Sequence, residues 1–131
     1  MKKLILIFIV SLAFLQCKVF HRTQNNAFKV YRIDSIQSYY LIYAQKGELR
    51  YKIVSKKVDN ECKSIKVNGL YAFDIHSMSQ VNGVSTIPSA SKYEVSGMAV
   101  DNTTTINVEN ETQWDLFYAD NIAGLCFKNK K

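Results

Sequence analysis

After residue 27, apolar and polar positions alternate over much of the chain, and this two-residue period predicts β-strands. The clearest case is a hairpin, in which β-forming residues 39–44 and 49–55 flank the short turn Gln45-Lys46-Gly47-Glu48. The same criteria predict further strands at residues 28–34, 65–67, 70–76, 103–109 and 122–127.

The second hairpin strand predicts its own orientation. Its apolar positions Leu49, Tyr51 and Ile53 point to one face of the sheet, because side chains alternate along a strand. Arg50 and Lys52 point to the other face, which we therefore expect to be solvated.

Three other segments have weaker local signals. Asn68-Gly69 between two β-runs is typical of a tight hairpin turn. Residues 77–97 contain Ser, Asn, Gly and Pro88, which interrupt any period. Residues 110–120 can form a helical turn, with Trp114, Phe117 and Tyr118 on one side.

These elements predict a mainly β fold. Five to seven short strands with at most one short helix fit a small single-domain barrel or sandwich. The spacing of a long first strand, a hairpin, an irregular segment and late strands is loosely similar to an OB-fold, which is one alternative.

The first residues have a different pattern. Met1-Lys2-Lys3 is followed by an almost unbroken apolar run from Leu4 to Leu15, which is typical of a secretory signal helix. The run is too short for a comfortable transmembrane helix, which needs roughly 20 apolar residues. A buried N-terminal core helix is the alternative, but such a helix normally has a polar face.

Cys17 follows this run directly, and the arrangement resembles the lipobox of bacterial lipoproteins. The resemblance covers only the first 17 residues, and the family's preferred Leu and small residue before the cysteine are Phe14 and Gln16 here. It implies lipidation of Cys17 and a location in the cell envelope, facing the periplasm or the exterior. The expected organisation is a signal peptide at 1–16, a lipid anchor and tether at 17–27 and a compact β-domain at 28–131.

Two other fates of the N-terminus remain open. Ser11-Leu12-Ala13 has the small-x-small form of an ordinary signal peptidase site, and cleavage there would give a secreted soluble protein. The third alternative is an uncleaved anchor.

The cysteine count fits lipidation. The three cysteines are Cys17, Cys62 and Cys126, and an odd thiol is a liability in an oxidising compartment. Lipidation of Cys17 leaves an even pair, so we expect a disulfide between Cys62 and Cys126. The alternative is two unpaired cysteines used as small core residues.

The net charge argues against a nucleic-acid partner. It is +6 for the whole chain, and loss of Lys2 and Lys3 with the signal lowers it to +4. Much of the remaining excess lies near the two ends, whereas a nucleic-acid-binding protein concentrates its charge on one face. The basic ends fit contact with anionic lipid near the anchor.

No motif indicates a catalytic, metal or cofactor site. Asp74 and His76 share one face of a predicted strand, but a metal site needs three or four ligands and no third one is adjacent. His21 lies in the tether. Asp115 and Asp120 flank aromatic residues in a manner similar to the carboxylate pair of glycosidases, although two nearby acids are common.

Tyrosines are numerous for a small core. They suggest a binding surface formed by Tyr40, Tyr43, Arg50 and Tyr51, on which an envelope protein or a glycan would dock. The alternative is that these tyrosines simply occupy half-buried sheet faces.

The expected function is therefore a non-catalytic binding module in the cell envelope. A small hydrolase that uses Asp74 and His76 is one alternative, and it requires both side chains in one pocket. A structural or immunity-type protein is the other, and it requires a large exposed apolar patch.

Overall fold

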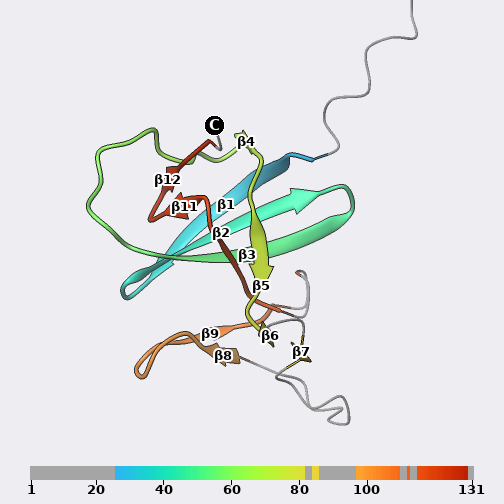
Figure 1. Ribbon diagram of the computed structural model, residues 1–131, viewed down its shortest axis with the longest axis vertical. Coiled ribbons are helices and arrows are strands. Elements are labelled where there is room, and N and C mark those ends of the chain that lie inside the picture. The colour runs from blue at the N-terminus through green and yellow to red at the C-terminus, as the bar shows by residue number, and fades with distance from the viewer. Residues whose placement is uncertain (1–25, 82–83, 86–96, 110–111, 113–114, 130–131) are drawn as a thin grey trace, which may run out of the picture.

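The computed structural model describes residues 26–81, 84–85, 97–109, 112 and 115–129 (Figure 1). The regular elements in this part of the chain are all strands, which confirms the mainly β prediction. They are β1 (Phe28–Ile36), β2 (Tyr39–Lys46), β3 (Leu49–Lys56), β4 (Leu70–Tyr71), β5 (Ile75–Ser77), β6 (Gln80–Val81), β7 (Val84–Ser85), β8 (Gly97–Ala99), β9 (Thr105–Asn107), β10 (Phe117–Ala119), β11 (Ile122–Ala123) and β12 (Cys126–Phe127).

The predicted helical turn within residues 110–120 is wrong where the structure describes that segment. Phe117–Ala119 is β10, because pairing with two neighbouring strands satisfies its backbone groups. Trp114, which was expected to share a helical face with Phe117, lies outside the described residues. In the described part of the chain, no helix has the length and apolar character needed to cross a membrane.

The strands β1, β2 and β3 form an antiparallel meander, and the predicted hairpin of β2 and β3 is confirmed. Two-residue turns join them at Gln37-Ser38 and Gly47-Glu48. Gly47 has a φ of 61°, a backbone conformation that glycine adopts without strain. Short turns between β-rich segments explain why the sequence signal was clearest here.

The sheet has six strands in the order β4-β1-β2-β3-β10-β5, and it curls into a half-barrel. Its edge strands β4 and β5 both belong to the segment Leu70–Ser77, which pairs with β1 at one end and with β10 at the other. One stretch of chain therefore brings the two edges together. With β10 parallel to β3, this connectivity agrees with the OB-like alternative.

The concave side of the sheet holds the main core. Its buried members come from the meander and from the segments that cover it: Phe28, Val30, Ile42, Ala44, Ile53, Ile65 and Phe73. Full burial of such a side chain contributes roughly 1.5–3 kcal/mol. The edge-to-face contact of Phe28 with Tyr51, with ring centroids 5.3 Å apart, adds to this packing.

A second core lies on the opposite face of the meander. The β8–β9 hairpin covers that face, whereas the β11–β12 hairpin lies on the other side of the meander (Figure 1). The buried members of this core are Leu41, Tyr43, Val54, Ile106 and Leu116. The prediction that the Lys52 face is solvated is therefore wrong, since Lys52 is only 2% exposed.

The C-terminal segment turns back on itself. Residues 122–127, predicted as one strand, form the hairpin of β11 and β12, and Gly124 in its turn has a φ of 60°. Cys126 of β12 forms a disulfide with Cys62, with the two Cα atoms 5.6 Å apart. The predicted disulfide is confirmed, and it ties the loop after β3 to the end of the domain.

The segment before β4 differs from its prediction. Residues 65–67 form no strand, and only Ser64 makes an isolated bridge, with Cys126. Asn68 and Gly69 instead bond to β1: the Asn68 amide donates to the Val30 carbonyl, and the Val30 amide donates to the Gly69 carbonyl. The Asn-Gly pair thus makes a turn that docks on β1 and does not connect two paired strands.

Candidate functional site

A groove of about 460 Å³ lies between β9 and the face of the meander that carries the second core. Its lining combines charged, polar and apolar side chains: Arg32, Asp34, Ser35, Ile36, Leu41, Tyr43, Lys52, Thr105, Ile106, Asn107 and Glu109. The strands β1, β2 and β3 supply one wall, and residues that follow β8 supply the other.

Glu109 is the centre of the polar network in this groove. Its Oε1 atom accepts hydrogen bonds from the Tyr43 hydroxyl at 2.7 Å, from Lys52 Nζ at 3.1 Å and from Arg32 Nη2 at 3.3 Å. Lys52 Nζ also donates to the backbone carbonyl of Asn107 at 2.8 Å. The network fastens the segment after β9 to three strands of the meander.

Burial and these contacts shift the ionisation of two groups. Burial raises the pKa of the Tyr43 hydroxyl, and its hydrogen bond to the Glu109 carboxylate raises it further. Burial alone would raise the pKa of Glu109, but the hydrogen bonds from Tyr43 and Lys52 and the nearby positive charges lower it below its ordinary value. Glu109 is therefore ionised at neutral pH and compensates the buried Lys52 ammonium.

Part of β1 borders the groove. Along this part, the edge of β1 that faces away from β2 is not paired with any strand that the structure describes. On that side, β4 pairs only with Phe28 and Lys29, while β2 pairs with β1 up to Ile36. Counting from the two-residue turn, Ile36 and Tyr39 form the hydrogen-bonded pair that closes the hairpin. By the antiparallel alternation, Ile33 and Ser35 direct their backbone groups away from β2.

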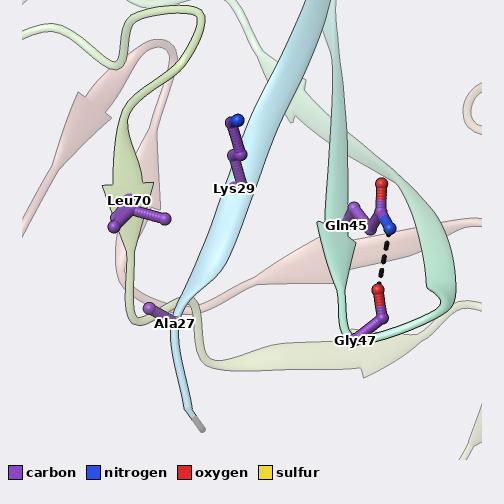
Figure 2. Close-up of a pocket in the computed structure, with 5 residues that line it drawn as sticks. All are labelled: Ala27, Lys29, Gln45, Gly47 and Leu70. Atoms are coloured by element: carbon purple, nitrogen blue, oxygen red, sulfur yellow. Dashed lines mark hydrogen bonds between the residues drawn. The ribbon is translucent and has the colours of Figure 1, made fainter. Parts of the chain in front are cut away.

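A second hollow lies at the other end of β1 (Figure 2). Its volume is about 350 Å³, and Ala27, Lys29, Gln45, Gly47 and Leu70 line it. The Gln45 side chain donates a hydrogen bond to the Gly47 carbonyl at 2.8 Å and so braces the β2–β3 turn. This hydrogen bond gives Gln45 a structural role in the turn.

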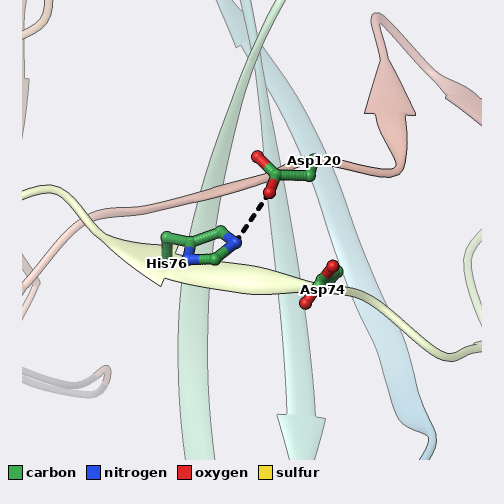
Figure 3. Close-up of side chains that lie close together, drawn as sticks. All are labelled: Asp74, His76 and Asp120. Carbon is green, nitrogen blue, oxygen red and sulfur yellow. Dashed lines mark ion pairs between the residues drawn. The ribbon is translucent and has the colours of Figure 1, made fainter.

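Asp74, His76 and Asp120 come together on another part of the surface (Figure 3). His76 Nε2 lies 2.9 Å from Asp120 Oδ2, and the side chains are 43% and 60% exposed. One ligand atom from each of the three residues lies within 4.8 Å of the others. The predicted proximity of Asp74 and His76 is confirmed, and Asp120 is a neighbour that the sequence argument did not find.

The local fold explains this cluster. His76 of β5 is opposite Tyr118 of β10, and their rings stack with centroids 5.1 Å apart. Just beyond the paired residues, the Asp120 amide donates to the Asp74 carbonyl at 3.1 Å. The buried Asn121 side chain accepts a hydrogen bond from the Asp74 amide and donates one to the Ala72 carbonyl.

The four residues predicted to form one aromatic binding surface lie on two faces. Tyr43 is only 1% exposed and packs in the second core, so its assignment to an exposed surface is wrong. Tyr51 packs on the opposite face against Phe28. Arg50 is exposed at the start of β3, and Tyr40 is half-buried.

Asp115 and Asp120 have different partners. The Asp115 carboxylate accepts hydrogen bonds from the hydroxyls of Ser77 and Ser79 and from the backbone amides of Ser79 and Leu116. Asp120 pairs with His76. Asp115, just before β10, therefore holds the residues at the end of β5. These contacts give no support to a glycosidase-like pair of Asp115 and Asp120.

Cys17, the predicted lipidation site, and His21 of the predicted tether lie outside the described part of the chain. Comparison with known proteins found no matching family model, no similar curated protein and no similar solved structure.

Proposed function

We propose that this chain is an exported cell-envelope protein, anchored by a lipid on Cys17, whose β-domain binds an extended polypeptide segment of another envelope protein. The observation that carries the binding proposal is the stretch Ile33–Ser35 of β1 beside the groove, whose outer edge pairs with no strand in the described part of the chain. A strand edge offers a row of backbone donors and acceptors to an added strand.

The edge and the groove share Arg32, Asp34, Ser35 and Ile36. Backbone groups of an added strand would pair with Ile33 and Ser35. Its side chains would meet two kinds of neighbour, the exposed charges of Arg32 and Asp34 and the apolar surface of Ile36 and Leu41. Contacts of alternate side chains with such neighbours give an added strand its sequence specificity.

The disulfide supports the export half of the proposal. Structural disulfides persist in oxidising compartments and are rare in the cytosol of most organisms. With Cys62 and Cys126 bridged, Cys17 is the one remaining cysteine of the chain, and lipidation would remove its thiol.

The anchor is tested by the intact mass of the protein made with its native N-terminus in a bacterial host. We expect a mass that begins at Cys17, carries acyl chains and lacks the two hydrogens lost in the disulfide. An unlipidated mass that begins near Phe14 would overturn the anchor while leaving the binding proposal in place.

The binding site is tested by photo-crosslinking in the same host. A benzophenone amino acid at position 35 should capture an envelope protein, whereas the same group at the exposed position 48, in the turn between β2 and β3, should not. Capture of a glycan and no protein, or equal capture from both positions, would overturn the proposal.

A second variant tests backbone pairing itself. Ser35→Pro removes an outward amide without removing a hydrogen bond to β2, so it should abolish capture while the domain stays folded. Ser35→Ala keeps that amide and should capture normally. Loss of capture in both variants would assign recognition to the serine side chain and contradict strand addition.

A further inference from the structure

We infer that Asp74, His76 and Asp120 form a binding site for a divalent transition-metal ion, with Zn²⁺ as the best-suited ion. The inference is independent of the proposed polypeptide-binding function. It rests on a donor set of one imidazole and two carboxylates, which strands β5 and β10 bring to one point of the surface (Figure 3).

The geometry is close to what a metal requires. Zinc binds imidazole nitrogen and carboxylate oxygen at about 2.0–2.2 Å in a tetrahedral arrangement, which places ligand atoms roughly 3.4 Å apart. His76 Nε2 and Asp120 Oδ2 are 2.9 Å apart, and all three ligand atoms lie within 4.8 Å of one another. A small rotation of the exposed Asp120 carboxylate narrows the difference, and water would complete the coordination shell.

The backbone around the site is fixed before any ion arrives. The hydrogen bond from the Asp120 amide to the Asp74 carbonyl joins the two acidic residues directly. Asn121, which is 7% exposed, bonds to the segment that holds Asp74 through both ends of its amide group. Stacking on Tyr118 restricts the His76 ring. Binding therefore costs little backbone ordering, which favours affinity.

The imidazole determines the class of ion. Mg²⁺ and Ca²⁺ prefer shells made entirely of oxygen, whereas imidazole suits Zn²⁺ and related transition metals. The two carboxylates supply the negative charge that a divalent cation neutralises.

The test is isothermal titration calorimetry of the full chain with ZnCl₂. The protein carries no polyhistidine tag and keeps its disulfide. We expect one Zn²⁺ per chain. His76→Ala, Asp74→Asn and Asp120→Asn should each weaken binding at least about tenfold, because loss even of a group that only supports a metal ligand costs roughly 10–100-fold in affinity. His21→Ala removes the other histidine of the chain and should leave the affinity unchanged.

A second measurement locates the ion without depending on a variant that folds poorly. In ¹⁵N spectra of the wild-type protein, Zn²⁺ should shift the imidazole nitrogens of His76 and leave those of His21 in place. An excess of Mg²⁺ should not reverse the shift. Absence of zinc binding, a loss of affinity in His21→Ala equal to that in the ligand variants, or reversal of the shift by the excess of Mg²⁺ would overturn the inference.

Discussion

Replacement of Glu109 by glutamine tests the polar network that fastens the segment after β9 to the meander. The substitution keeps the shape of the side chain and one acceptor oxygen, but it removes the negative charge opposite Lys52. In the wild-type protein, one Glu109 oxygen accepts hydrogen bonds from Tyr43, Lys52 and Arg32. Glu109→Gln therefore changes the charge of the network while disturbing the packing very little.

The expected loss of stability is about 2 kcal/mol at pH 7. Removal of one partner from a fully buried ion pair costs roughly 3–5 kcal/mol, because the other charge stays desolvated. Lys52 is fully buried, but the Glu109 side chain is 36% exposed, so water screens part of the interaction and the value must be reduced. Urea unfolding followed by far-ultraviolet circular dichroism measures the difference.

The pH dependence gives the prediction its sign. The folded-state pKa of Glu109 lies below its ordinary value of 4.5, so the ionised carboxylate stabilises the folded protein above that pH. This contribution is lost as the pH falls through the folded-state pKa. The difference in unfolding free energy between the wild-type protein and Glu109→Gln should therefore stay at its full value from pH 7 down towards pH 4.5 and narrow below that pH.

The matched control is Glu48→Gln in the exposed turn between β2 and β3. It removes the same charge at the surface and should change the free energy of unfolding by less than about 0.5 kcal/mol. Equal losses in the two variants, or a Glu109→Gln difference that persists at pH 2, would refute the assignment of Glu109 as the partner of the buried lysine.

Three other predictions concern stability and use the same unfolding assay. The double variant Cys62→Ser/Cys126→Ser should lose about 4 kcal/mol of unfolding free energy, because the disulfide closes a loop across a sequence separation of 64. A loss under about 1 kcal/mol would contradict this account. Gly47→Ala should cost about 1 kcal/mol, since its φ of 61° is strained for alanine. Gly124→Ala should cost more than Gly47→Ala although the two φ angles are nearly the same. The new Cβ at position 124 would lie 3.1 Å from Val58 Cγ2, whereas a Cβ at position 47 has no neighbour within 4 Å. Equal losses in the two variants would show that the backbone conformation alone sets the loss of stability.

The meander was predictable because its information is local. Alternation in residues 49–55 and the glycine of the turn define two strands that are neighbours in sequence and in space. The disulfide was predictable for a chemical reason, the parity of the cysteines. Neither prediction required knowledge of which distant segments pack against one another.

The failures have the opposite cause. Lys52 was expected in water because its own strand alternates, but β9 and the residues after it cover that face and supply Asn107 and Glu109 as partners. Asp120 was missed as a neighbour of His76 because β5 and β10 are far apart in sequence. Long-range pairing decides both cases, and the period of a single strand contains no information about it.

The segment Leu70–Ser77 has a consequence for cooperativity. It pairs with β1 at one end and with β10 at the other, so neither edge of the sheet can open without disturbing a strand that the other edge also needs. The meander and the C-terminal strands should therefore share one global unfolding transition and not separate into two units of different stability. Amide hydrogen exchange measures this directly: the core amides of β2 and those of β10 should exchange with the same free energy of opening.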